Sequence, residues 1–197
     1  MKKKAITLLD LDGTIVDSFA AVKSAIVTTL ERLACPVPQE LDCVQKVGEL
    51  LPVAIKSLPS SISFCHFKQE YDAVLRAAPL AGVRVPEYIP QMLAQLKEKH
   101  DLMVLTNKRQ DVAETICKAL FPAGAFLQVI GRTSTVPLKP DGPIAEELQQ
   151  RDIPLSAIRL LIGDSEEDRM TALRLGVEYT DVRQMETLIK EERMIFT

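Results

Sequence analysis

The sequence predicts an α/β fold, a Rossmann-like parallel sheet with helices on both faces, plus an inserted helical segment. From residue 86 onward, short apolar runs alternate with helical patterns, as is typical of parallel strands covered by helices. The first apolar run is instead followed by residues 17–82, which show no convincing strand pattern. We therefore expect a core domain of residues 1–16 and 83–197 and a helical domain of residues 17–82.

Five apolar runs are predicted to be strands. The first, at residues 5–9, is short and is closed by a glycine turn. The other runs are nearly continuous in apolar character, except for the weaker last one, and lie at residues 102–106, 127–131, 159–163 and 177–182. Because the chain continues only briefly after residue 176, the number of strands at that edge of the sheet stays open.

Helical periodicity predicts the elements between these runs. The helices of the core are expected at residues 87–100, 110–120, 143–151, 166–175 and 184–192. The inserted segment is expected to hold three helices, near residues 18–34, 39–57 and 61–77, separated by Pro36, Pro38 and Pro59.

Composition excludes several kinds of partner. The hydrophobic content of 47% and the charged content of 26% are ordinary for a globular protein. A net charge of -3 gives no strongly basic surface for nucleic acid. No apolar run approaches the ~18 residues that cross a membrane. We expect a cytoplasmic protein, a monomer or weak homodimer, with no nucleic-acid or membrane partner.

The cysteines predict neither disulfides nor a metal site. No pair has CxxC spacing, so we expect free, buried thiols of a reducing compartment at Cys35, Cys43, Cys65 and Cys117. His66 is the only histidine near them, which argues against zinc. His100 ends a predicted helix and is given no chemical role.

Charged and polar side chains follow the ends of several predicted strands. Asp10 and Asp12 follow the first strand, and Gly13 lets the backbone turn tightly. At or after the ends of three other strands lie Thr106, Asn107, Lys139, Asp164 and Asp168. Ligands of parallel sheets bind beyond the carboxyl ends of the strands. Because carboxylates suit Mg²⁺ and the other groups suit a phosphate, the set predicts a metal-and-phosphate site.

These motifs occur in a characteristic order, DxDGT, TN, KP and GDxxxD. This order resembles the haloacid dehalogenase superfamily of phosphatases and phosphotransferases. The stretches "LLDLDGTIVDS", "VLTNKR", "LKPDGP" and "LIGDSEEDRMTALRLG" look most similar to its phosphoglycolate phosphatase and β-phosphoglucomutase branch. That branch carries a small helical cap after the first motif. The resemblance therefore implies that residues 17–82 are a cap.

The resemblance also implies catalytic roles. Asp10 is expected to be the nucleophile that forms an aspartyl phosphate, and Asp12 the general acid and base. Thr106 and Asn107 are expected to bind the phosphoryl group. Lys139 is expected to pair with the phosphate and with Asp10.

Mg²⁺ is the implied cofactor. Asp10, the backbone carbonyl of Asp12, and Asp164 are its expected ligands. Asp168 is expected to be a further ligand or a support behind the ligands. Considered alone, Asp164 would also suit the N-cap of the helix at residue 166.

In the cap, residues 46–49 resemble the small glycine loop by which related caps reach the site. Lys46 and Gly48 are therefore candidate substrate-binding residues, with Lys46 meeting a second anionic group or remaining a solvated charge. Lys56 does not match the spacing of the Schiff-base lysine in phosphonate-cleaving relatives. Lys108 and Arg109 are expected to be surface charges, with a contribution to phosphate binding as the alternative.

Together these features predict a Mg²⁺-dependent phosphatase that hydrolyses a small phosphorylated metabolite, phosphoglycolate-like or a sugar phosphate. Two alternatives stay open. One is a β-phosphoglucomutase-type isomerase, which would protect the same aspartyl phosphate from water. The other is a catalytically silent binding or regulatory protein on the same scaffold.

Overall fold

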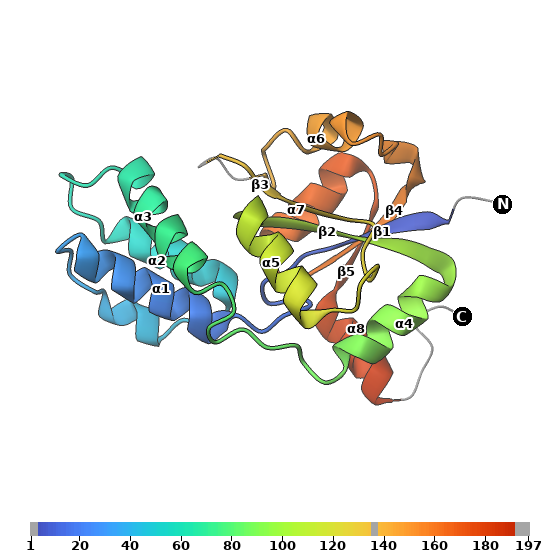
Figure 1. Cartoon of the computed structure of the whole chain (residues 1–197), viewed down its shortest axis with the longest axis horizontal. Coiled ribbons are helices and arrows are strands. Elements are labelled where there is room, and N and C mark those ends of the chain that lie inside the picture. Colours follow the sequence, from blue (N-terminus) through green and yellow to red (C-terminus); the bar gives the residue numbers. More distant parts are fainter. Residues whose placement is uncertain (1–3, 135–137, 192–197) are drawn as a thin grey trace.

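The computed structural model describes residues 4–134 and 138–191, and these residues form a five-stranded parallel sheet in the order β3-β2-β1-β4-β5 (Figure 1). The strands are β1 (Ala5–Leu9), β2 (His100–Arg109), β3 (Gln128–Arg132), β4 (Ile158–Gly163) and β5 (Glu178–Asp181). The predicted parallel α/β fold is confirmed. The short strand β5 forms the edge of the sheet at which the sequence did not settle the number of strands.

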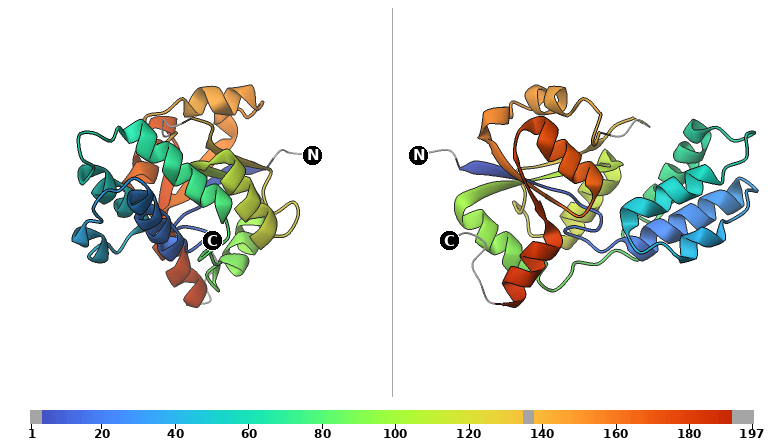
Figure 2. Two further views of the ribbon diagram at one scale, coloured as in Figure 1. Left: turned by 60° about the vertical axis from the view of Figure 1, so that its left-hand side comes forward. Right: turned by 180° about the vertical axis from the view of Figure 1, so that it is seen from behind.

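Helices cover both faces of this sheet (Figures 1 and 2). One face carries α4 (Ile89–Lys99), α5 (Gln110–Leu120) and α8 (Val182–Lys190), and the other carries α6 (Ile144–Gln150) and α7 (Glu166–Leu175). Successive strand residues point to opposite faces. Leu9 and Val104 therefore pack in the core under α4, α5 and α8, whereas Leu8 and Met103 pack under α6 and α7. Both faces are buried, which explains the continuous apolar runs.

Between β1 and β2 the chain forms a separate group of helices beyond the carboxyl end of β1 (Figure 1). They are α1 (Phe19–Arg32), the 3₁₀ helix η1 (Gln39–Asp42), α2 (Val47–Lys56) and α3 (Phe64–Ala77). Helix α1 packs against α2 and α3 through a core that includes Ile26, Leu50 and Phe67. Within the described ranges, every helix is too short or too polar to cross a membrane.

Three predicted elements differ from the structure. The expected helix 39–57 is wrong in its middle, because η1 ends at Asp42 and Lys46 is extended at the N-cap of α2. The helix expected to end at His100 ends one residue earlier, because His100 is the C-cap of α4 and also pairs with Ala5 as the first residue of β2. Strand β2 also continues beyond Thr106 to Arg109. The predicted end of the last helix, residue 192, lies outside the described residues.

The two segments that connect the inserted helices to the sheet pair with each other. The backbone N–H of Asp17 donates to the carbonyl of Arg84 at 2.8 Å, and the N–H of Arg84 donates back at 3.0 Å. The guanidinium of Arg84 also donates to Asp17 Oδ2. The entry and exit of the insertion therefore lie side by side.

The cysteines are free, as predicted. Burial was expected for all of them, and it is found for Cys35 and Cys117. It is wrong for Cys43 and Cys65, which are exposed.

Candidate active site

The carboxyl ends of β1, β2 and β4 open on one cavity of about 270 Å³. Because β1 lies between β2 and β4, residues that follow these strands become neighbours. The cavity brings together most of the predicted site residues, namely Asp10, Asp12, Gly48, Thr106, Asn107, Lys139 and Asp164. Its remaining walls come largely from α2 and α3, so the sheet and the inserted helices share this space.

Three carboxylates converge at the sheet. Each of Asp10, Asp164 and Asp168 offers an oxygen, and these oxygens lie within 4.8 Å of one another. Two glycines permit this approach. A Cβ at Gly163 would lie 2.4 Å from Asp168 Cγ, and a Cβ at Gly13, where φ is +82°, would lie 2.7 Å from Asp164 Oδ2. A larger residue at either position would collide with the carboxylate beside it.

Lys139 joins two of these carboxylates. Its Nζ donates to Asp10 Oδ1 at 2.6 Å and to Asp168 Oδ1 at 2.5 Å, and the lysine is buried. The other oxygen of Asp168 accepts from the backbone N–H and the hydroxyl of Ser165, which caps α7. Ser165, and not Asp164, is therefore the N-cap of this helix. Both oxygens of Asp168 already have donors, which favours its role as a support for Lys139.

Asp12 is not part of the group of three carboxylates, and it pairs with a different lysine, Lys108. Lys108 Nζ donates to Asp12 Oδ1 and Oδ2, both at 2.9 Å. The Lys108 side chain is 3% exposed, so its predicted place at the surface is wrong. Its backbone N–H donates to the Thr106 hydroxyl, which holds Lys108 at the end of β2. Arg109 instead pairs with Asp111 two residues further on.

The side chain of Asn107 organises the segment around Lys139. Asn107 Nδ2 donates to the Lys139 carbonyl at 3.0 Å, and Asn107 Oδ1 accepts from the Lys139 N–H at 2.8 Å. Asn107 Nδ2 also donates to Glu167 Oε2. These contacts leave the backbone of Asn107, more than its side chain, as the group available to a phosphate.

The electrostatics of the site favour a bound cation. Burial raises the pKa of Asp10 to about 8, although Lys139 opposes this, and Asp168 and Asp164 add to the increase. Burial, with Asp168 again adding, raises the pKa of Asp164 to about 6. Burial alone would lower the pKa of Lys139, but Asp10 and Asp168 together raise it. An oxygen-only donor set with excess negative charge fits Mg²⁺.

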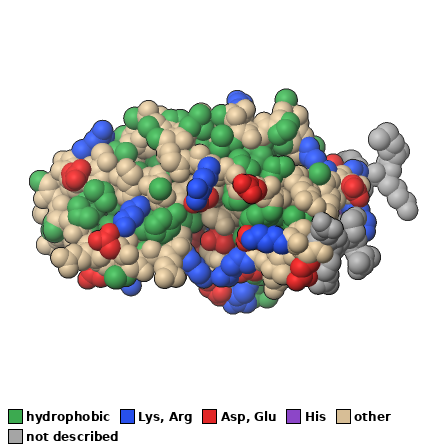
Figure 3. All heavy atoms as spheres, turned by 90° about the horizontal axis from the view of Figure 1, so that it is seen from below, with side chains coloured by type: hydrophobic (Ala, Val, Ile, Leu, Met, Phe, Trp, Pro, Cys, Tyr) green, Lys and Arg blue, Asp and Glu red, His purple; other side chains and the backbone are tan. Residues whose placement is uncertain are grey.

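Of the two residues of the inserted helices that were predicted to bind substrate, only Gly48 lines this cavity. Gly48 lines the cavity, and a Cβ there would lie 3.9 Å from Ser165 Cβ. Lys46 is exposed and lines a neighbouring hollow together with Asp17 and Arg183. Figure 3 shows charged side chains gathered in the middle of one face, where the inserted helices meet the rest of the chain. The position of Lys46 therefore does not bring it into the cavity of Asp10.

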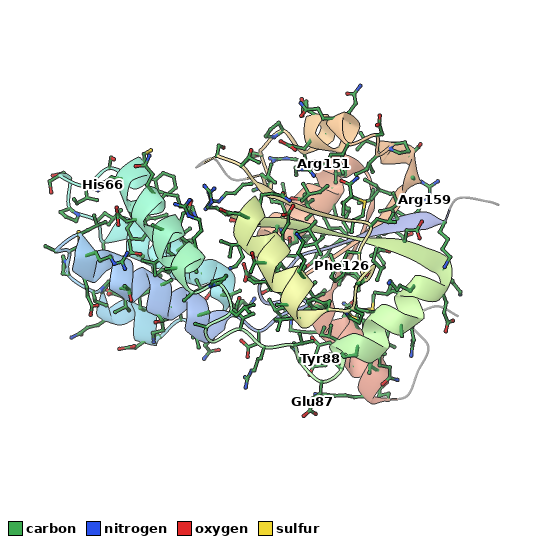
Figure 4. The ribbon with its side chains drawn as sticks, in the orientation of Figure 1. His66, Glu87, Tyr88, Phe126, Arg151 and Arg159 are labelled. Atoms are coloured by element: carbon green, nitrogen blue, oxygen red, sulfur yellow. The ribbon has the colours of Figure 1, made fainter. Side chains whose placement is uncertain are left out.

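Sequence reasoning missed a second group of buried polar and charged side chains at and behind this cavity. Lys68, Tyr71 and Asp72 come from α3, and Arg132 ends β3. Arg132 is 2% exposed and its Nη2 donates to Asp72 Oδ1. In the sequence, this group could be found only from the helical periodicity of α3. That periodicity places Lys68 and Asp72 on the same buried side of the helix as Phe67. By contrast, His66 lies at the outer end of α3, away from the sheet (Figure 4).

Comparisons with known proteins agree with this geometry. A family model described as haloacid dehalogenase-like hydrolase matches residues 7–182. A phosphoglycolate phosphatase of Aquifex aeolicus is 26% identical over 180 residues, which cover 88% of this chain and 82% of that protein. A protein of Caldanaerobacter subterraneus, provisionally named pyrophosphatase PpaX, is 27% identical over 194 residues, which cover 93% of this chain and 83% of that protein.

Solved structures show the same fold. A haloacid dehalogenase-like hydrolase from Streptococcus pneumoniae has a TM-score of 0.70 at 22% identity. The match covers 91% of this chain and 84% of that chain.

Proposed function

Because the chain belongs to the haloacid dehalogenase-like hydrolase family, we propose that it is a Mg²⁺-dependent phosphatase of a small phosphorylated metabolite. Phosphoglycolate-like compounds and sugar phosphates are the first candidates, and the relative named phosphoglycolate phosphatase supports this class. The observation that carries the proposal is the buried Asp10, which lies against Lys139 at the end of the central strand, with two further carboxylates beside it.

In the first step, a carboxylate oxygen of Asp10 attacks phosphorus. The bond between phosphorus and the ester oxygen breaks, and its electron pair goes to that oxygen. Asp12 donates a proton to the leaving oxygen, so that an alcohol departs and an aspartyl phosphate remains on Asp10. Asp10 and Asp12 both line the cavity, which allows them to act on one substrate.

In the second step, water attacks the phosphorus of the aspartyl phosphate. Asp12, now ionised, accepts a proton from this water, and the bond between Asp10 and phosphorus breaks. Phosphate leaves, and both aspartates return to their starting states. Each aspartate has a lysine of its own to hold it in place, since Asp10 lies with Lys139 and Asp12 lies with Lys108.

Other residues hold the phosphoryl group and balance its charge. Lys139 neutralises negative charge that is spread over the phosphoryl oxygens in a loose transition state. The Thr106 hydroxyl and the backbone of Asn107 bind these oxygens. Asp168, held by Ser165, keeps Lys139 in place.

The carboxylates fit a magnesium ion, which supplies charge neutralisation and orientation of the phosphate when it is bound. Asp10, Asp164 and the backbone carbonyl of Asp12 are the proposed ligands. Thr14 donates to Asp164 Oδ1 at 3.4 Å and so helps to orient that ligand.

We propose further that residues 17–82 act as a cap. Helices α2 and α3 supply much of the cavity wall, so they exclude water and limit the size of the substrate. A cavity of about 270 Å³ is below the ~300–1,000 Å³ of most sites for drug-sized ligands, which favours a small metabolite.

The direct test is phosphate release from a panel of phosphorylated metabolites, with Mg²⁺ or with EDTA. Mg²⁺-dependent release supports the proposal. Conversion of a sugar phosphate without release of phosphate would indicate the isomerase, and no turnover of any kind would indicate a silent protein. The expected cytoplasmic location and the monomeric or weakly dimeric state stay predictions.

A further inference from the structure

A pair of buried cations lines the cavity on the side of the inserted helices. Lys68 comes from α3 and Arg132 from the end of β3, and both line the cavity. Asp72 lies 3.6 Å from Lys68 Nζ and also pairs with Arg132, but it is not among the residues that line the cavity. The two cations are therefore in contact with the cavity, and their shared carboxylate lies behind them.

The charges of Lys68, Arg132 and Asp72 do not cancel. Lys68 and Arg132 share the single carboxylate of Asp72, whereas Lys108 has the carboxylate of Asp12. The cluster of Lys68, Arg132 and Asp72 thus carries one excess positive charge. Burial, followed by the charge of Arg132, lowers the pKa of Lys68 to about 8, which shows that Asp72 compensates only in part.

Of the two cations, Lys68 has the greater capacity to bind a ligand. Arg132 donates from Nε to the Asn107 carbonyl, from Nη1 to the Ser134 carbonyl and from Nη2 to Asp72. The ammonium of Lys68 has three donors. In the described residues it lies 3.6 Å from Asp72 Oδ1 and 4.5 Å from the centre of the Tyr71 ring.

Burying this ammonium is costly, since a charge removed from water is stabilised only by close partners. The side chain of Lys68 is 6% exposed, and its nearest carboxylate is shared. A buried cation that keeps an incomplete set of partners beside a cavity is a candidate for ligand binding.

We infer that Lys68 binds a second anionic group, a carboxylate or a phosphate, on the leaving-group part of the substrate. This inference rests on the proposed function and narrows its substrate to small phosphate esters with two anionic groups. The phosphoryl group lies at Asp10 and Lys139, and the rest of the substrate extends toward α3. Lys68 thereby takes the role that the sequence suggested for Lys46.

The test compares matched substrates. 2-Phosphoglycolate and 2-hydroxyethyl phosphate differ by a carboxylate, and 1,3-propanediol bisphosphate and 3-hydroxypropyl phosphate differ by a phosphate. The wild type is expected to prefer the anionic member of at least one pair by about 10–100-fold in kcat/KM, the scale of a hydrogen bond to a charged group. The preferred pair distinguishes a carboxylate from a phosphate.

In Lys68→Met this preference is expected to fall to within about threefold, mainly through KM of the anionic member. Lys68→Arg is expected to restore part of it. Lys56→Met is the matched control, because Lys56 is an exposed lysine of α2 that does not line the cavity. A wild type without preference, or an unchanged preference in Lys68→Met, would overturn the inference.

Failure of the proposed function gives a different result. If no ester releases phosphate, calorimetry with Mg²⁺ compares the binding of phosphonoacetate and ethylphosphonate. Tighter binding of phosphonoacetate that is lost in Lys68→Met supports the inference, and equal binding by the wild type overturns it. Circular dichroism checks folding, and Lys68→Gln replaces Lys68→Met if the latter does not fold.

Discussion

Lys108 donates hydrogen bonds to both carboxylate oxygens of Asp12, at 2.9 Å each, across 96 residues of sequence. The pair lines the cavity, and the Lys108 side chain is almost fully buried. Because both oxygens are engaged, Lys108 fixes the orientation of the Asp12 carboxyl group at the cavity. The proposed acid and base is thus positioned by a side chain that lies outside the motif of the two aspartates.

Lys108→Met is expected to lower kcat by about 10–100-fold, because Asp12 loses the group that orients it. In the first step, isolated by rapid-mixing measurement of alcohol or phenol release, the loss should be greater for alkyl phosphates than for esters of an acidic phenol, since only the alkyl esters need strong protonation. Lys118→Met, at an exposed position on α5, is the control. Equal losses for both kinds of ester would show that Lys108 acts on another step.

Asp10→Asn is expected to abolish turnover, because an amide does not attack phosphorus. The fold should remain. Burial raises the pKa of Asp10 from 3.8 to about 8, so its ionisation costs stability progressively as the pH rises between these values. An amide avoids this cost. We expect Tm in EDTA at pH 7.5 to be no lower than that of the wild type. More than about 1% residual activity, with deamidation excluded, would reject Asp10 as the nucleophile.

Asp12→Ala is expected to slow the first step for alkyl phosphates by about 10²–10⁴-fold, the usual scale of a general acid. The first step with a phenyl ester should be much less affected, since a phenolate leaves without a proton. Rapid-mixing measurement of phenol release isolates this step from hydrolysis of the aspartyl phosphate. If alkyl and phenyl esters slow equally, Asp12 does not donate the proton.

The sequence allowed the motif residues to be predicted because each lies next to a strand end that its own local pattern reveals. Asp10 follows an apolar run, and so does Asp164, and a parallel sheet brings such ends together. Lys139 lies several residues beyond the end of its strand, so the KP motif was needed to support its prediction. Its two partners, Asp10 and Asp168, are 129 and 29 residues away, and only the structure shows both contacts.

The contacts that the sequence did not reveal join charges from distant elements. Arg132 and Asp72 are 60 residues apart, and each alone resembles an ordinary surface charge. The break before α2 has a similar origin. A Cβ at Gly13 would lie 2.8 Å from Val47 Cγ1, so the start of α2 packs against the turn after β1. Helical periodicity carries no information about such tertiary contacts.

Activity is expected to require Mg²⁺ and to be lost in EDTA, because Asp10, Asp164 and Asp168 otherwise crowd negative charge into one buried place. Calcium is expected to substitute poorly. It accepts a larger and more flexible set of oxygens, often with bidentate carboxylates, and would engage the oxygen of Asp10 that attacks phosphorus. Phosphate release is measured in chelator with each metal restored in turn. Full activity in EDTA, or equal rates with calcium, would contradict the proposed site.

The preference for a second anionic group is expected to depend on pH through Lys68. The groups around its ammonium are Asp72 and Tyr71 on α3, Arg132 at the end of β3 and Lys108 on β2. Burial and Arg132 lower its pKa from 10.5 to about 8, so Lys68 loses its positive charge as the pH rises through that value.

The measurement is the ratio of kcat/KM for 2-phosphoglycolate to that for 2-hydroxyethyl phosphate between pH 6.5 and 10. The parameter kcat/KM reports the ionisation of the free enzyme, and the ratio cancels groups that act equally on both substrates. We expect a constant ratio below about pH 8 and a decline above it. Lys68→Arg should keep its preference to pH 10, because arginine stays charged throughout this range. A wild-type ratio that stays high and constant to pH 10 would show that Lys68 does not supply the charge that selects the substrate.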